Sequence, residues 1–104
     1  MQVQINTDHN IQGHDALARQ VTAVVEGALS RFRDRVTRIE VHLSDVNGGK
    51  TGLDDKRCLL EARLAGLQPI AVSHQAPTVE QAVDGAAEKL KSALDTKIGR
   101  MGTS

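Results

Sequence analysis

The stretch that decides the fold is residues 77–101, PTVEQAVDGAAEKLKSALDTKIGRM, near the end of the printed chain. At the helical period of about 100° per residue, its apolar side chains fall on one stripe. The stripe consists of Val79, Val83, Ala86, Ala87, Leu90, Leu94, Ile98 and Met101. Pro77 and Thr78 form a helix start signal, so the pattern predicts one long amphipathic helix that opens at about Thr78.

The charged side chains of this predicted helix are sorted by sign, with acids on one side of the apolar stripe and bases on the other. The acids are Glu80, Asp84, Glu88 and Asp95, and the bases are Lys89, Lys97 and Arg100. The whole chain has 13 basic and 13 acidic residues, so its formal net charge is zero. The overall charge therefore gives no reason to bind an anion, whereas a local cationic edge on a rigid element does.

Upstream of this helix, the sequence predicts four strands and a first helix. Residues 1–7, 36–44, 56–64 and 69–75 alternate apolar and polar side chains, which is the period of a strand. From His14 to about Phe32 the spacing is helical. The order β-α-β-β-β-α predicts an α+β fold of two layers, a four-stranded sheet with both helices on one face.

The composition is that of one small globular domain, for which we expect a location in the cytoplasm. A chain of 104 residues suits a single hydrophobic core, so we expect residues 1–104 to form one domain. No apolar run approaches the roughly 20 residues that cross a bilayer, and the first ten residues lack the features of a secretory signal. We therefore expect no membrane partner.

The chain has one cysteine and one aromatic residue, and both narrow the functions that can be expected. Cys58 is the single cysteine and falls in phase with the apolar positions of its strand, which predicts a small buried hydrophobic side chain rather than a reactive thiol. Phe32 is the only aromatic residue among Phe, Tyr and Trp. A protein that stacks nucleic-acid bases on aromatic side chains is therefore not expected.

Two segments carry a local surplus of positive charge at the C-terminal ends of the predicted helices. Residues 31–38 hold four arginines against one aspartate, and residues 89–100 hold three lysines and one arginine against one aspartate. Phosphates neutralised by such cations release condensed counterions, which favours RNA binding. Cations at helix C-termini also oppose the helix dipole, so helix stabilisation is the alternative explanation, and Arg35 could instead pair with Asp34 or Glu40.

Several local matches, in the right order and spacing, resemble one known family. They are Asn10-Ile11 ahead of Ala16-Leu17, Phe32-Arg33-Asp34-Arg35-Val36, and Ala82-Val83-Asp84-Gly85 followed by Glu88-Lys89-Leu90. With the order of the predicted elements, they make the chain resemble the short ribosome hibernation promoting factors, also called ribosome-associated inhibitors or ribosomal subunit-interface proteins. The resemblance covers nearly the whole chain and implies a fold similar to double-stranded RNA-binding domains.

The resemblance also implies a function without catalysis. Such a protein binds the decoding region of the small ribosomal subunit, where mRNA and tRNA would otherwise lie, and blocks translation under stress or stationary growth. The implied partners are the small subunit and its rRNA, with no cofactor and no small-molecule substrate. We predict that phosphates are contacted by nine side chains: Arg31, Arg33, Arg35, Lys56, Arg57, Lys89, Lys91, Lys97 and Arg100.

The alternative is a non-ribosomal module of the same fold that binds a protein through its neutral surface and its acidic loop, residues 45–55. Motifs for other chemistry are incomplete. His9 and His14 lack a recognised metal-ligand spacing, and the Gly-Lys-Thr of the loop lacks both the first glycine of a phosphate-binding loop and a following helix. The loop also lacks the calcium spacing of an EF-hand. His42 and His74 could meet across the sheet, but no Ser or Cys accompanies them as a nucleophile, so we expect no enzyme.

Overall fold

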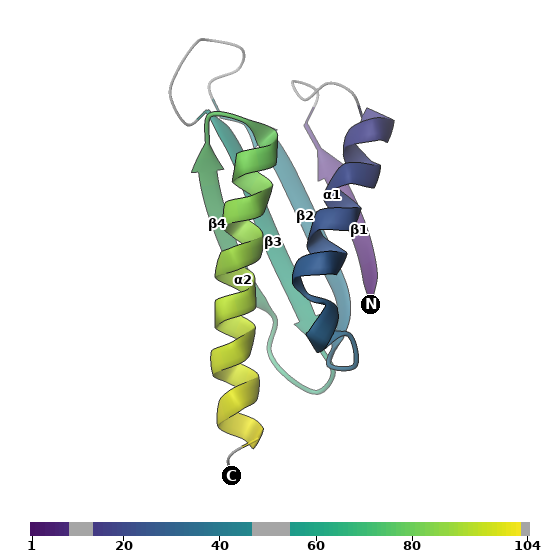
Figure 1. Ribbon diagram of the computed structural model, residues 1–104, viewed down its shortest axis with the longest axis vertical. Helices are drawn as coiled ribbons and strands as arrows, with labels where there is room; N and C mark the ends of the chain where they lie inside the picture. The colour runs from purple at the N-terminus through teal and green to yellow at the C-terminus, as the bar shows by residue number, and fades with distance from the viewer. Residues whose placement is uncertain (9–13, 47–54, 103–104) are drawn as a thin grey trace.

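The computed structural model describes residues 1–8, 14–46 and 55–102, with His14 and residues 100–102 described in the backbone alone. In chain order the elements are β1 (Gln2–Thr7), α1 (His14–Ala28), the 3-10 turn η1 (Ser30–Phe32), β2 (Val36–Asp45), β3 (Lys56–Leu64), β4 (Ile70–Ala76) and α2 (Val79–Gly102). Figure 1 shows them as a sheet with two long helices in front of it. The predicted element order is confirmed.

The four strands form one mixed sheet in the order β1-β2-β3-β4. Strand β1 runs parallel to β2, with Val3 opposite Ile39, while β2 with β3 and β3 with β4 are antiparallel. A parallel pair needs a crossover connection, and α1 supplies it between β1 and β2. In the structure this crossover helix lies on the same face of the sheet as α2.

Both helices lie on one face of the sheet and run in the same direction, from the top to the bottom of Figure 1. Helix α2 packs on β3 and β4, and α1 lies beside it toward β1. The core between the layers is apolar: Ile39 and Leu60 of the sheet and Leu90 of α2 are fully buried, each with 0% of its surface exposed. The predicted two-layer α+β fold is thus confirmed.

The other face of the sheet is polar and open to solvent. At its centre the Glu40 carboxylate accepts a hydrogen bond from Arg63 Nε at 3.3 Å and pairs with Arg38 Nη2 at 2.9 Å. Desolvation opposes ionisation of Glu40, but the guanidinium groups of Arg38 and Arg63 outweigh it and lower the pKa of the carboxyl group. The charges of this face are therefore largely paired with one another.

The first helix ends earlier than the sequence predicted. Helical spacing continues to Phe32, but α1 stops at Ala28 and the chain turns through Leu29 into η1. The Phe32 N–H donates to the Leu29 carbonyl at 2.9 Å, an i→i−3 bond typical of a 3-10 turn. This tighter turn keeps both Leu29 and Phe32 in the core, with 0% and 5% of their surfaces exposed.

The second helix begins as predicted. The Thr78 hydroxyl accepts a hydrogen bond from the Gln81 N–H at 3.1 Å, and the Thr78 carbonyl accepts one from the Ala82 N–H at 3.0 Å. The side-chain bond satisfies one of the backbone donors that every helix start leaves open. Thr78 is therefore the N-cap of α2.

The two strand histidines lie on opposite faces of the sheet. His42 is exposed on the polar face and pairs in register with Leu59, while His74 pairs with the buried Cys58 on the helix side. The expectation that they could meet across the sheet is wrong. His42 shares its face of the sheet with Leu59 and His74 shares its face with Cys58, and these two neighbouring residues of β3 point to opposite faces. The His74 ring instead lies under Gly85 of α2, at the place a Cβ there would occupy.

Cys58 is buried as predicted, and burial raises the pKa of its thiol to about 12. Within the part of the chain that the structure describes, no helix is long and apolar enough to cross a membrane. The predicted loop of residues 45–55 falls largely outside the described residues, and so do His9 and Lys50. Its two ends are described: Asp45 closes β2 and Asp55 precedes β3, and both are buried.

Candidate nucleic-acid interface

The fold brings the two cationic segments to one end of the molecule. Since α1 and α2 run in the same direction, η1 with the residues after it and the last turns of α2 share the lower end in Figure 1. We call this the cationic end and define it by Arg31, Arg33, Arg35 and Lys97. Arg100 belongs to the same part of α2, but its side chain lies outside the described residues.

Arg31 connects the two helical segments. Its guanidinium forms an ion pair with Asp95 of α2 and lies over the Phe32 ring, 4.9 Å from the ring centroid. The planar guanidinium is suited to both contacts at once. The orientation of Arg31 is therefore fixed by its neighbours, and part of its charge is compensated inside the protein.

Arg33 and Arg35 extend from a well-held backbone. The Arg35 N–H donates to the Phe32 carbonyl at 2.9 Å, and the Arg35 carbonyl accepts from the Ala65 N–H at 3.3 Å. Both side chains are exposed, and the ion pairs found among the described residues include neither of them. Glu40, an alternative partner considered for Arg35, is held by Arg38 and Arg63 instead. These two guanidiniums are available to an external anion.

An open hollow lies between η1 and α2 beside these arginines. It has a volume of about 360 Å³ and is lined by Arg31, Phe32, Asp34, Arg35, Asp95, Ile98 and Gly99. At about 30 Å³ per water in the liquid, this is room for roughly a dozen waters, and so for a phosphate group with part of its sugar. Arg31 and Arg35 supply donors on the hollow, while Asp34 and Asp95 keep its net charge close to zero.

The remaining predicted contact residues lie elsewhere. Lys89 is on the flank of α2 next to β4, where its Nζ donates to the Ser73 carbonyl at 2.9 Å. Since β4 is an edge strand, Lys89 satisfies an edge carbonyl and places a charge there, a common protection of sheet edges. Lys91, also on α2, is half-buried.

Lys56 and Arg57 are at the start of β3, at the opposite end of the molecule from the cationic end. Lys56 Nζ pairs with Asp55 at 3.0 Å and Asp45 at 3.3 Å. The hydrogen bond that Lys56 donates to the Asp55 carboxylate is the largest cause that raises the pKa of Lys56, and desolvation partly opposes it. Lys56 is thus a partner of two buried carboxylates, whereas Arg57 is exposed on the polar face of the sheet.

The structure therefore brings Arg31 and Arg35 together on one hollow, while Arg33 and the half-buried Lys97 belong to the two segments that share this end of the molecule. Lys56, Arg57 and Lys89 lie apart from them. Sequence reasoning missed Asp95 as the partner of Arg31. No local signal could have revealed it, because the two residues come from different elements. It also missed Gly85, although a glycine inside a long predicted helix costs helix stability and so points to a close packing contact.

Comparison with known proteins agrees with the fold. A family model described as Sigma 54 modulation protein / S30EA ribosomal protein matches residues 3–101. The crystal structure of the Thermus thermophilus Protein Y N-terminal domain is similar with a TM-score of 0.73 and 21% identity, over 92% of this chain and 98% of that chain. A ribosomal subunit interface protein from Coxiella burnetii is similar with a TM-score of 0.70 and 20% identity, over 95% of this chain and 99% of that chain.

A search of curated proteins finds no match. At such low identity, the two solved structures establish the shared fold, and the family match carries the assignment. It spans almost the whole chain and confirms the resemblance to ribosome-associated hibernation factors drawn from the sequence motifs. This chain belongs to the sigma 54 modulation protein / S30EA ribosomal protein family.

Proposed function

We propose that this protein is a ribosome-associated translation inhibitor that binds the small subunit through phosphate contacts and occupies the decoding region. The observation that carries the proposal is the gathering of cations from two distant segments at one end of a chain with zero net charge. Membership of the family supports the ribosome as the partner. The solved structure from Coxiella burnetii, described as a ribosomal subunit interface protein, supports it as well.

The contacts available at the cationic end suit RNA phosphate. Arg33 and Arg35 are exposed and carry donors in a planar fork that matches phosphate oxygens. Four phosphate contacts would give a dependence of log affinity on log salt of about −3 to −4, so affinity falls roughly a hundredfold between about 50 and 200 mM salt. Charge compensation by Asp34 and Asp95 limits nonspecific attraction to RNA in general.

To inhibit translation, the protein would need only to occupy its site on the ribosome. A rigid body lodged where mRNA and tRNA pass would block translation without turning over a substrate, so the proposal includes no catalytic residue. The place of action would be the cytoplasm, where ribosomes are found. The pairing of the Glu40, Arg38 and Arg63 charges on the open sheet face favours the helix side, with its cationic end, as the surface that meets RNA.

The test is co-sedimentation of the purified protein with small ribosomal subunits at about 50 and about 200 mM monovalent salt. We expect pelleting with the small subunit at low salt and its loss at high salt. Arg35→Glu should abolish the low-salt pelleting, whereas Arg19→Glu, the same change at an exposed α1 position away from the cationic end, should preserve it. No pelleting at low salt would refute the proposal and leave the protein-interaction module as the remaining function.

A further inference from the structure

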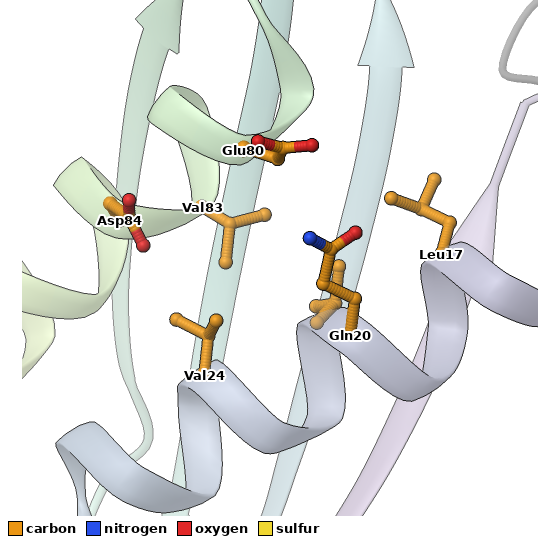
Figure 2. A pocket seen from close by; sticks show the side chains of 7 residues that line it. Leu17, Gln20, Val24, Glu80, Val83 and Asp84 are labelled. Carbon is orange, nitrogen blue, oxygen red and sulfur yellow. The ribbon is translucent and has the colours of Figure 1, made fainter.

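A second recessed surface lies between α1 and the first two turns of α2, away from the cationic end (Figure 2). Its volume is about 120 Å³. Figure 2 shows its walls, which come from α1 on one side and α2 on the other. The lining residues are Leu17, Gln20, Val21 and Val24 of α1 with Glu80, Val83 and Asp84 of α2. We call this surface the interhelical groove.

The floor of the groove is apolar and incompletely covered. Val21 and Val83 are buried, with 3% and 1% of their surfaces exposed, whereas Leu17 and Val24 are half-buried. In Figure 2 the side chains of Val24 and Val83 point toward each other across the gap. Because valine is short, facing valines leave a recess that longer side chains would have filled, and apolar surface there stays in contact with water.

The rim of the groove is acidic on the α2 side. Glu80 and Asp84 are exposed and stand one helical turn apart on the same flank. The ion pairs found in the described part of the chain include neither carboxylate. Figure 2 shows Gln20 reaching from α1 into the gap between the helices, so its amide adds a neutral hydrogen-bonding group to the rim.

We propose that the interhelical groove binds an arginine or lysine side chain from a basic segment of a partner protein. Two like charges at i and i+4 repel each other, and a cation between them relieves that repulsion. The long aliphatic stem of Arg or Lys can cover the apolar floor of the groove while its charged head stays beside the carboxylates at the rim. The size of about 120 Å³, roughly four waters, fits such a stem.

The same features exclude the ligand proposed for the cationic end. Phosphate would meet the Glu80 and Asp84 carboxylates, and the recess is about a third of the volume of the hollow beside Arg35. The two surfaces therefore suit ligands of opposite charge. The cationic end offers guanidinium groups to RNA, and the interhelical groove offers two carboxylates and an apolar recess to a basic protein segment.

The experiment uses a short peptide, acetyl-Gly-Arg-Leu-Arg-Gly-amide, titrated into the whole protein while the methyl resonances of Val24 and Val83 are followed by NMR. The control peptide has citrulline in place of each arginine, which keeps the shape and removes the charge. We expect saturable shifts of these methyl groups with the arginine peptide and none with the citrulline peptide. No ribosome is present, so the outcome does not depend on the function proposed above.

Two variants complete the test. The double variant Glu80→Gln with Asp84→Asn should bind the arginine peptide about fivefold more weakly, as expected for the loss of two exposed ion pairs. Glu26→Gln, the same change at an exposed α1 carboxylate outside the groove, should leave the affinity unchanged. Absence of saturable shifts, equal binding of the two peptides, or equal weakening by Glu26→Gln would each overturn the proposal.

Discussion

Replacement of Gly85 by alanine tests whether the close approach of α2 to β4 is set by a glycine. In an exposed helix interior, alanine is more stable than glycine by about 1 kcal/mol. At Gly85, however, a Cβ would lie 2.6 Å from the Cγ of His74 and would overlap the rest of the imidazole ring. Overpacking of this kind costs about 1–3 kcal/mol, so we expect Gly85→Ala to destabilise the protein by about 1 kcal/mol.

Two matched glycine-to-alanine changes separate the effect of the His74 contact from the helix propensity of alanine. Gly27 and Gly99 also lie in helices, and a Cβ at either would meet nothing within 4 Å. Gly27→Ala and Gly99→Ala should therefore stabilise the protein by a few tenths to about 1 kcal/mol. In a His74→Ala background the clash is gone, and Gly85→Ala should then become stabilising, which reverses its sign.

The free energies of unfolding come from urea titrations followed by far-ultraviolet circular dichroism, with all variants compared at the same denaturant slope. The coupling between Gly85→Ala and His74→Ala should be about 2 kcal/mol, within the range seen for residues in direct contact. If Gly85→Ala stabilises the wild-type protein as much as Gly27→Ala does, the packing argument is refuted.

Three further predictions concern single contacts. Thr78→Ala removes the N-cap of α2 and should lower the free energy of unfolding by about 1 kcal/mol, whereas Thr78→Ser should cost much less, as measured by urea unfolding. Asp95→Asn removes the ion-pair partner of the exposed Arg31, so it should change the free energy of unfolding by less than about 1 kcal/mol. Because it frees a guanidinium, it should also increase low-salt pelleting with small subunits. Reduced pelleting would count against the cationic end as the RNA-binding surface. Burial raises the pKa of the Cys58 thiol to about 12, so at pH 8 Ellman's reagent should label it only upon unfolding, and fast labelling of the folded protein would contradict its placement in the core.

Much of the fold could be predicted because its signals are local. The alternation in residues 56–64 predicted β3 with the bounds that the structure has, and Thr78 predicted the start of α2. The family was also within reach of the sequence, because its motifs lie along the chain in order. A strand period, a helical period and a cap each depend on neighbours a few residues away, so one sequence is enough to read them.

The end of α1 could not be read in this way. Helical spacing continues past Ala28 to Phe32, whereas the chain leaves the α-helix at Ala28 and buries Leu29 and Phe32 through a 3-10 turn. The candidate site was likewise predicted in part. The charges of residues 31–35 and 89–100 indicated cations, but the sequence could not separate Arg35, which is free for a partner, from Lys56, which is held by Asp45 and Asp55.

The sequence by itself thus determined the elements, their order, their apolar faces and the local surplus of charge. Only the tertiary structure decided that both helices end on the same side, that Asp95 meets Arg31, and that Glu80 and Asp84 border a recess. The physical reason is range: hydrogen-bond geometry and side-chain period act over one or two turns of chain. Ion pairs, recesses and the direction of one helix relative to another depend on residues that only the packed core brings together.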